Sequence, residues 1–117
     1  MNKSDTGKLG ELETARFLRK NGYNIVAANF HSRFGEIDVI AENKKQLCFV
    51  EVKTRSPGQM FNPADSVTLS KRKKIISTAN VFLSQFSTKK DIRFDIAEVI
   101  VEDGKVKSIN LIENAFE

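Results

Sequence analysis

Apolar residues recur at helical spacing in two parts of the chain and predict two helices. The first stripe comprises Leu9, Leu12, Ala15 and Leu18, and the second comprises Ile75, Ile76, Ala79, Phe82, Leu83 and Phe86. Gly22 stands just past the first stripe, where a glycine commonly caps a helix end. A short apolar stretch over residues 24–29 follows it and predicts a strand.

Strict alternation over residues 36–41 and 47–54 predicts two further strands, because successive side chains of a strand point to opposite faces. The first alternation sets Ile37, Val39 and Ala41 against Glu36, Asp38 and Ile40, and the second sets Cys48, Val50 and Val52 against Phe49, Glu51 and Lys53. The polar residues 42–46 between the two segments predict a hairpin turn.

The remaining segments complete the order helix, three strands, helix, two strands. Residues 56–65 hold two prolines and a glycine and predict a loop, whereas residues 92–101 and 106–112 are strand-like on either side of Asp103–Gly104, a strong hairpin signal. We therefore expect one α/β domain over residues 1–117, with a mixed sheet flanked by helices. The chain lacks the glycine-rich phosphate loop of nucleotide-binding folds.

The predicted hairpin brings two acids together. If the chain turns at Lys44–Lys45, Asp38 stands opposite Glu51, with Cβ atoms roughly 5 Å apart. Two carboxylates in that position repel each other unless a cation lies between them, and Mg²⁺ or Mn²⁺ would suit their oxygens. A metal-bound water is a natural nucleophile for phosphodiester hydrolysis, and Lys53 on the same strand face could stabilise transition-state charge. The competing interpretation is a solvated strand face with an exposed ion pair.

Charge and cysteine content limit the kinds of partner and the cellular compartment that the sequence suggests. The net charge of +4 suits a polyanionic partner, although simple solubility explains it equally well. Cys48 is the one cysteine, so an intramolecular disulfide and a cysteine zinc cluster are excluded. No apolar run is long enough to span a bilayer, and the first residues lack the apolar stretch of a signal peptide, so we expect a cytoplasmic protein with no membrane partner.

Short motifs along nearly the whole chain resemble the YraN family of small bacterial proteins. They are Gly10–Glu11, Gly22–Tyr23, Asn29, Gly35–Glu36–Ile37–Asp38, Phe49–Val50–Glu51–Val52–Lys53, Arg55, Lys71, Arg93–Phe94–Asp95 and Asn114–Ala115–Phe116. That family is similar to the restriction-endonuclease-like, or PD-(D/E)XK, superfamily, which includes archaeal Holliday-junction resolvases. The resemblance implies that Asp38 and Glu51 are catalytic metal ligands, that Lys53 is the catalytic lysine and that Glu11 completes the metal site.

Several basic side chains are candidates for contacts with a phosphate backbone. Lys71, Arg72, Lys73 and Lys74 stand together near the start of the second predicted helix, where cations oppose the helix dipole. A bound phosphate would offset that cost, while a solvated charged turn is the alternative. The superfamily resemblance singles out Lys71, and Arg33 and Arg55 are further candidates. Arg93 and Asp95 are expected to form a structural pair, and Cys48 to pack in the core.

Three functions compete for this sequence. The first is a Mg²⁺- or Mn²⁺-dependent endonuclease acting on DNA, with branched DNA favoured by the resolvase resemblance. The second is a nucleic-acid-binding module that does not cleave by itself. The third, a purely structural domain, leaves the pairing of Asp38 and Glu51 unexplained. A homodimer is an open alternative, since a four-way junction is two-fold symmetric.

Overall fold

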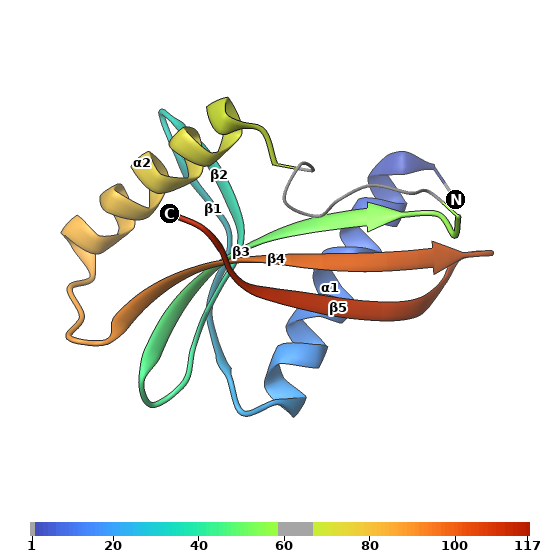
Figure 1. The fold of residues 1–117 in the computed structure, drawn as a ribbon, viewed down its shortest axis with the longest axis horizontal. Coiled ribbons are helices and arrows are strands. Elements are labelled where there is room, and N and C mark those ends of the chain that lie inside the picture. Colours follow the sequence, from blue (N-terminus) through green and yellow to red (C-terminus); the bar gives the residue numbers. More distant parts are fainter. Residues whose placement is uncertain (1, 59–66) are drawn as a thin grey trace.

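The computed structural model describes residues 2–58 and 67–117, and these residues form two helices and five strands in the predicted order (Figure 1). The helices are α1 (Lys3–Lys20) and α2 (Leu69–Gln85), and the strands are β1 (Asn24–Ser32), β2 (Gly35–Glu42), β3 (Gln46–Arg55), β4 (Asp91–Glu102) and β5 (Lys105–Phe116). Part of the predicted loop at 56–65 lies outside the described residues.

All five strands form one mixed sheet in the order β1-β2-β3-β4-β5. Consecutive strands joined by turns pair antiparallel, whereas β3 and β4 pair in parallel because the chain between them passes through α2. At the β4–β5 turn, Asp103 and Gly104 both adopt positive φ, as the predicted two-residue hairpin requires. The α/β class and the mixed sheet are therefore as expected.

The two helices cover opposite faces of the sheet and give the protein two apolar clusters (Figure 1). On one face, Ile75, Ala79 and Phe82 of α2 pack with residues such as Phe49 and Ile96. On the other face, Leu18 at the end of α1 packs with Val39, Ala41, Cys48, Val50 and Ala97. Strand β3 contributes to both clusters, so it is buried on both sides.

The predicted register of the β2–β3 hairpin is confirmed, and its paired region ends next to the acids. Four residue pairs from Glu42–Leu47 to Val39–Val50 follow the expected register, and the pairing stops there. The expected strict alternation of β2 fails at this point, because Ile37 packs in the α2 cluster while Val39 packs in the α1 cluster. Asp38 therefore marks the place where β2 separates from β3.

The predicted apolar stripe of α1 is only partly correct. Leu18 is buried, but Leu12 is 51% exposed, and the side of α1 that faces the sheet carries Gly10 and Thr14 instead. Gly10 is there because α1 runs so close to β3 that a Cβ atom would overlap the Thr54 hydroxyl. Hydropathy does not identify a buried face made of a glycine and a threonine.

Two other details differ from the sequence predictions. Phe86 was expected on the apolar stripe of α2, but α2 ends at Gln85 and Phe86 is 58% exposed, with its ring against Phe82. Strand β1, predicted over residues 24–29, continues to Ser32. At the other helix, Gly22 has φ +88 just beyond the end of α1, as a cap there requires.

Candidate active site

Asp38 lies where β2 separates from β3, and its side chain accepts a hydrogen bond from the backbone of β3. Its Oδ2 accepts a hydrogen bond from the backbone N of Val52 at 2.8 Å. Burial, followed by hydrogen bonding to Glu51 and the charge of that group, raises the pKa of Asp38 from its ordinary value of 3.8 to about 8. The two acids that the sequence placed opposite each other are thus in direct contact.

Glu51 is the more deeply buried acid, with only 5% of its surface exposed. Its Oε2 is buried and accepts no hydrogen bond from the described residues. The Nζ atom of Lys71, from the first turn of α2, lies 3.6 Å from this oxygen. Buried carboxylate oxygens are normally hydrogen-bonded. An oxygen that has only an ion pair longer than a hydrogen bond is therefore unusual.

These features fit a divalent cation. Mg²⁺ prefers carboxylate oxygens, keeps several waters and commonly uses only one or two protein carboxylates. Asp38 and Glu51 supply such a pair, and one of them has a buried oxygen with no hydrogen bond from the residues that the structure describes. Within residues 2–58 and 67–117, no cluster of three or more histidine, cysteine, aspartate and glutamate side chains is arranged to hold a metal. The donor set therefore matches a hydrated Mg²⁺ or Mn²⁺ better than a fully caged ion.

Glu11, the third predicted metal ligand, lies beside the pair but faces Asn29. Its Oε1 accepts a hydrogen bond from Asn29 Nδ2 at 2.9 Å, and the same nitrogen donates to Glu36 Oε1 at 2.8 Å. Burial raises the pKa of Glu11, and the charges of Asp38 and Glu36 add to this effect. Glu11 and Asp38 also line one groove between α1 and β1.

Lys53 follows Glu51 on the same face of β3 and borders an open cavity of about 600 Å³. Arg55 and Glu11 line the same cavity, so a lysine, an arginine and an acid meet at one opening. On the parallel neighbour β4, Glu98 stands in register with Lys53. Positively and negatively charged side chains therefore lie around one solvent-accessible space at this end of β3.

The basic run at the start of α2 divides into residues with different contacts. Lys71 points to Glu51, and Lys73 and Lys74 are exposed. Arg72 is engaged in the fold, because its Nε donates to the Val67 carbonyl at 2.9 Å and its guanidinium lies 5.8 Å from the centre of the Phe116 ring. The structure thus leaves Lys73 and Lys74 as the members of the run that extend into solvent.

Arg33 lies at the turn between β1 and β2. It is exposed, with its guanidinium 4.7 Å above the Phe34 ring. This turn rests on the middle of α2, where Ser32 Oγ and Thr78 Oγ1 are 2.8 Å apart. Arg33 therefore belongs to the α2 side of the molecule, away from the cavity that Lys53 and Arg55 line.

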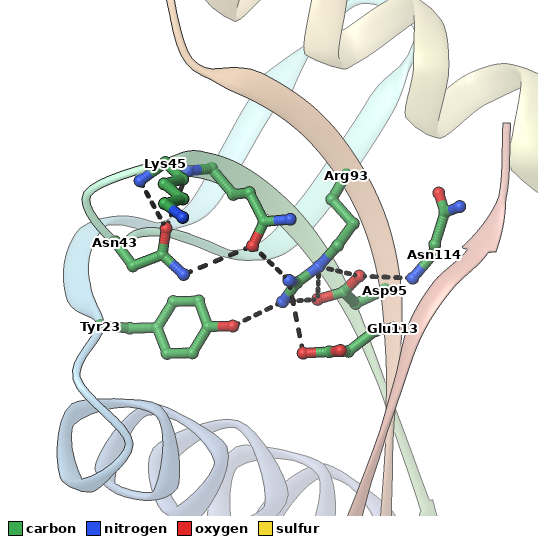
Figure 2. Close-up of polar contacts among 8 residues, drawn as sticks. Tyr23, Asn43, Lys45, Arg93, Asp95, Glu113 and Asn114 are labelled. Atoms are coloured by element: carbon green, nitrogen blue, oxygen red, sulfur yellow. Dashed lines mark hydrogen bonds and ion pairs between the residues drawn. The ribbon is translucent and has the colours of Figure 1, made fainter.

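Arg93 and Asp95 form the expected structural pair, which Figure 2 shows within a buried polar network. The Arg93 guanidinium also donates to the Tyr23 hydroxyl at 2.6 Å and to Gln46 Oε1 at 2.7 Å, and Asp95 Oδ1 accepts from the backbone N of Asn114. These contacts tie the connection between α1 and β1 to β3, β4 and β5. Nearby, burial and the charge of Asp95 raise the pKa of Cys48 to about 12, as suits a core thiol.

Two residues near the site were not assigned a role from the sequence. Asn29 holds both Glu11 and Glu36, and it does so from a left-handed backbone conformation with φ +52. Asparagine tolerates this conformation better than most residues, which is a weak sequence signal. Glu98 could be found only once the parallel register of β3 and β4 was known.

The fold and the site define a class of protein. It is an α/β protein with a buried acid pair beside a lysine at the end of a central strand. Residues 10–99 match the profile of the Uncharacterised protein family UPF0102, the YraN family that the sequence motifs resemble, and the chain belongs to this family. It is 41% identical over 118 residues to a UPF0102 protein of Chlorobium phaeobacteroides, covering 96% of this chain and 94% of the relative. It is 42% identical over 120 residues to one of Caldicellulosiruptor bescii, covering 99% and 100%. Neither α1 nor α2 is long and apolar enough to cross a membrane.

Proposed function

We propose that this chain is a metal-dependent phosphodiesterase that cleaves nucleic acid, with DNA as its substrate. The observation that carries the proposal is the buried contact between Asp38 and Glu51, in which a glutamate oxygen has no hydrogen bond from the described residues. Without a cation or an extra proton, this pair is a net cost to the fold. A site that accepts such a cost is more readily explained by function than by stability.

The chain's own residues can be given roles in hydrolysis. A divalent cation held by Asp38 and Glu51 would supply a water that loses its proton easily and would neutralise charge on the phosphate. In hydrolysis a water oxygen would bond to phosphorus as the bond to the leaving oxygen breaks, and the proton that the water loses would balance the one that the leaving oxygen gains. Lys53, on the same face of β3 as Glu51, would stabilise the extra negative charge on the phosphate at this stage. Arg55, at the same cavity, is a candidate to hold a neighbouring phosphate.

A nucleic-acid-binding module that does not cleave by itself is the second candidate, and Glu11 favours it. In this structure Glu11 is bound to Asn29, so the three predicted metal ligands are not gathered around one point. A partner or a substrate that releases Glu11 would then be needed for activity. Both candidates share a basic surface and nucleic-acid affinity, and only cleavage separates them.

A cleavage assay over linear, flapped, single-stranded and four-way DNA and the corresponding RNAs, each with Mg²⁺ and Mn²⁺, tests the proposal. We expect metal-dependent cutting of at least one substrate, abolished by EDTA and by Glu51→Gln. Retained binding without cutting in any condition would favour the binding module. An absence of both binding and cutting at low salt would contradict both candidates.

A further inference from the structure

Lys71 and Glu51 form an unusual ion pair that the phosphodiesterase chemistry does not require. The Nζ atom of Lys71 lies 3.6 Å from Glu51 Oε2, and the lysine side chain is 45% exposed while the glutamate is 5% exposed. The separation exceeds the length of a normal hydrogen bond, so the lysine contributes mainly its charge. Lys71 thus places a partly exposed positive charge next to a buried negative one.

The start of α2 fixes the backbone from which Lys71 reaches Glu51. Thr68 caps the helix, and its Oγ1 accepts a hydrogen bond from the backbone N of Lys71 at 3.1 Å. Lys71 lies at the N-terminus of α2, where the helix dipole disfavours cations. The first turn of α2 has no acidic residue that would offset this effect. Attraction to Glu51 compensates for this placement.

We propose that Lys71 is the resident cation of the metal-free site, which neutralises Glu51 until a divalent cation displaces it. The proposal rests on the proposed function, because it assumes that Glu51 is a metal ligand. When the metal binds, the partly exposed ammonium moves out toward solvent, where a substrate phosphate can take it up. Lys71 therefore competes with the metal and acts as a positioning residue of the site.

Competition has a consequence that a simple phosphate contact does not share. Removing the Lys71 charge relieves repulsion toward an incoming divalent cation, so the metal should bind more tightly. A lysine whose function is limited to contacting phosphate would leave metal affinity in the absence of nucleic acid unchanged. The direction of the change in metal affinity therefore distinguishes the two roles.

The test is a calorimetric titration of the full chain with Mn²⁺ at pH 8, where protons compete less for the acids than at neutral pH. Lys71→Met keeps the length of the side chain and removes its charge, and we expect roughly tenfold tighter binding, as for loss of a like charge at a partly exposed site. Lys71→Arg keeps the charge and should bind like the wild type. Lys74→Met, an exposed lysine of the same helix, is the matched control and should also be unchanged.

Thermal unfolding of the same variants gives a second readout. In EDTA, Lys71→Met should unfold at a lower temperature than Lys74→Met, because Glu51 loses its neutralising charge, and saturating Mn²⁺ should abolish the difference. Lys71→Ala serves as a second neutral variant if Lys71→Met folds poorly. Equal or weaker Mn²⁺ affinity in the neutral variants would overturn the role of Lys71 and leave the proposed function standing. No Mn²⁺ binding by any variant would overturn both.

Discussion

Asp38 and Glu51 bring two like-charged groups into contact in the folded chain. Glu51 is buried and Asp38 is partly buried, and neither faces a cation within hydrogen-bond length among the described residues. Burial favours the protonated form of a carboxyl group, so the pair holds an extra proton at pH values where an exposed aspartate is ionised. The metal-free protein should therefore be sensitive to pH in a way that identifies Asp38.

Replacing Asp38 with Asn should remove this sensitivity. The pKa of Asp38 is raised in the fold from 3.8 to about 8, so the folded state binds its proton more tightly than the unfolded state. Stability from this group is complete below about pH 4 and is lost as the pH rises toward 8. Asp38→Asn, which can still accept from the backbone N of Val52, should be more stable than wild type by at least about 1 kcal/mol at pH 8 in EDTA. Urea unfolding at pH 5 and pH 8 measures this, and parallel pH profiles for the two proteins would contradict it.

Lys53 should affect the chemical step far more than binding. Its position beside Glu51 on β3 suits it to stabilise charge that develops on the phosphate, so Lys53→Ala should lower the single-turnover cleavage rate by about a hundredfold or more. Affinity for the same substrate should change only a few-fold. Lys89→Ala, an exposed lysine after α2, is the control. A Lys53→Ala protein that cleaves at the wild-type rate would remove this residue from the mechanism.

The contact of α1 with β3 depends on Gly10, and this contact also positions Glu11 next to it in the chain. A Cβ atom at residue 10 would overlap the Thr54 hydroxyl, whereas one at Gly7 meets nothing within 4 Å. Gly10→Ala should therefore destabilise the protein by about 1–3 kcal/mol, as overpacking commonly does. Gly7→Ala in the same helix should be neutral or stabilising by up to about 1 kcal/mol, from helix propensity alone. Urea denaturation of both variants tests this, and equal stabilities would show that α1 can shift off β3 without cost.

The basic start of α2 should make nucleic-acid binding depend on salt. Arg72 is needed for packing, so the charge-removal variant is Lys73→Ala with Lys74→Ala. Each lost phosphate contact should reduce the slope of log K against log salt by about 0.9, so the slope should become shallower by up to about 1.8. Lys105→Ala with Lys107→Ala, two exposed lysines of β5, is the control pair. Fluorescence titrations at several salt concentrations that give the same slope for both variants would show that Lys73 and Lys74 form only a solvated surface.

Much of this molecule could be predicted from local patterns. The order of elements, the mixed sheet and the β2–β3 register follow from alternation and turn residues, which are properties of neighbouring positions in the chain. Extending that register by one pair predicts the contact of Asp38 with Glu51, although the strand pairing itself ends at Val39 and Val50. The Arg93–Asp95 pair could be foreseen for the same reason, because the two residues lie two apart on one strand.

Other features depend on contacts that a local pattern does not contain. Leu12 is exposed because the close approach of α1 to β3 requires Gly10 and Thr14 on the buried side. Ile37 faces α2 because β2 leaves β3 at Asp38, which breaks the alternation that the sequence displays. The capture of Glu11 by Asn29 joins a helix to an edge strand, and no spacing along the chain reveals it.

Binding of Mn²⁺ to the metal-free protein, measured by isothermal titration calorimetry, tests the central claim most directly. We predict one class of sites in the wild type, weakened at least about tenfold in Asp38→Asn and in Glu51→Gln, since each variant removes a charged ligand. Glu13→Gln, which removes an acid of α1 that pairs with Arg16, should bind like the wild type. Identical Mn²⁺ affinity in the wild type, Asp38→Asn and Glu51→Gln would contradict the assignment of these two acids as the metal site.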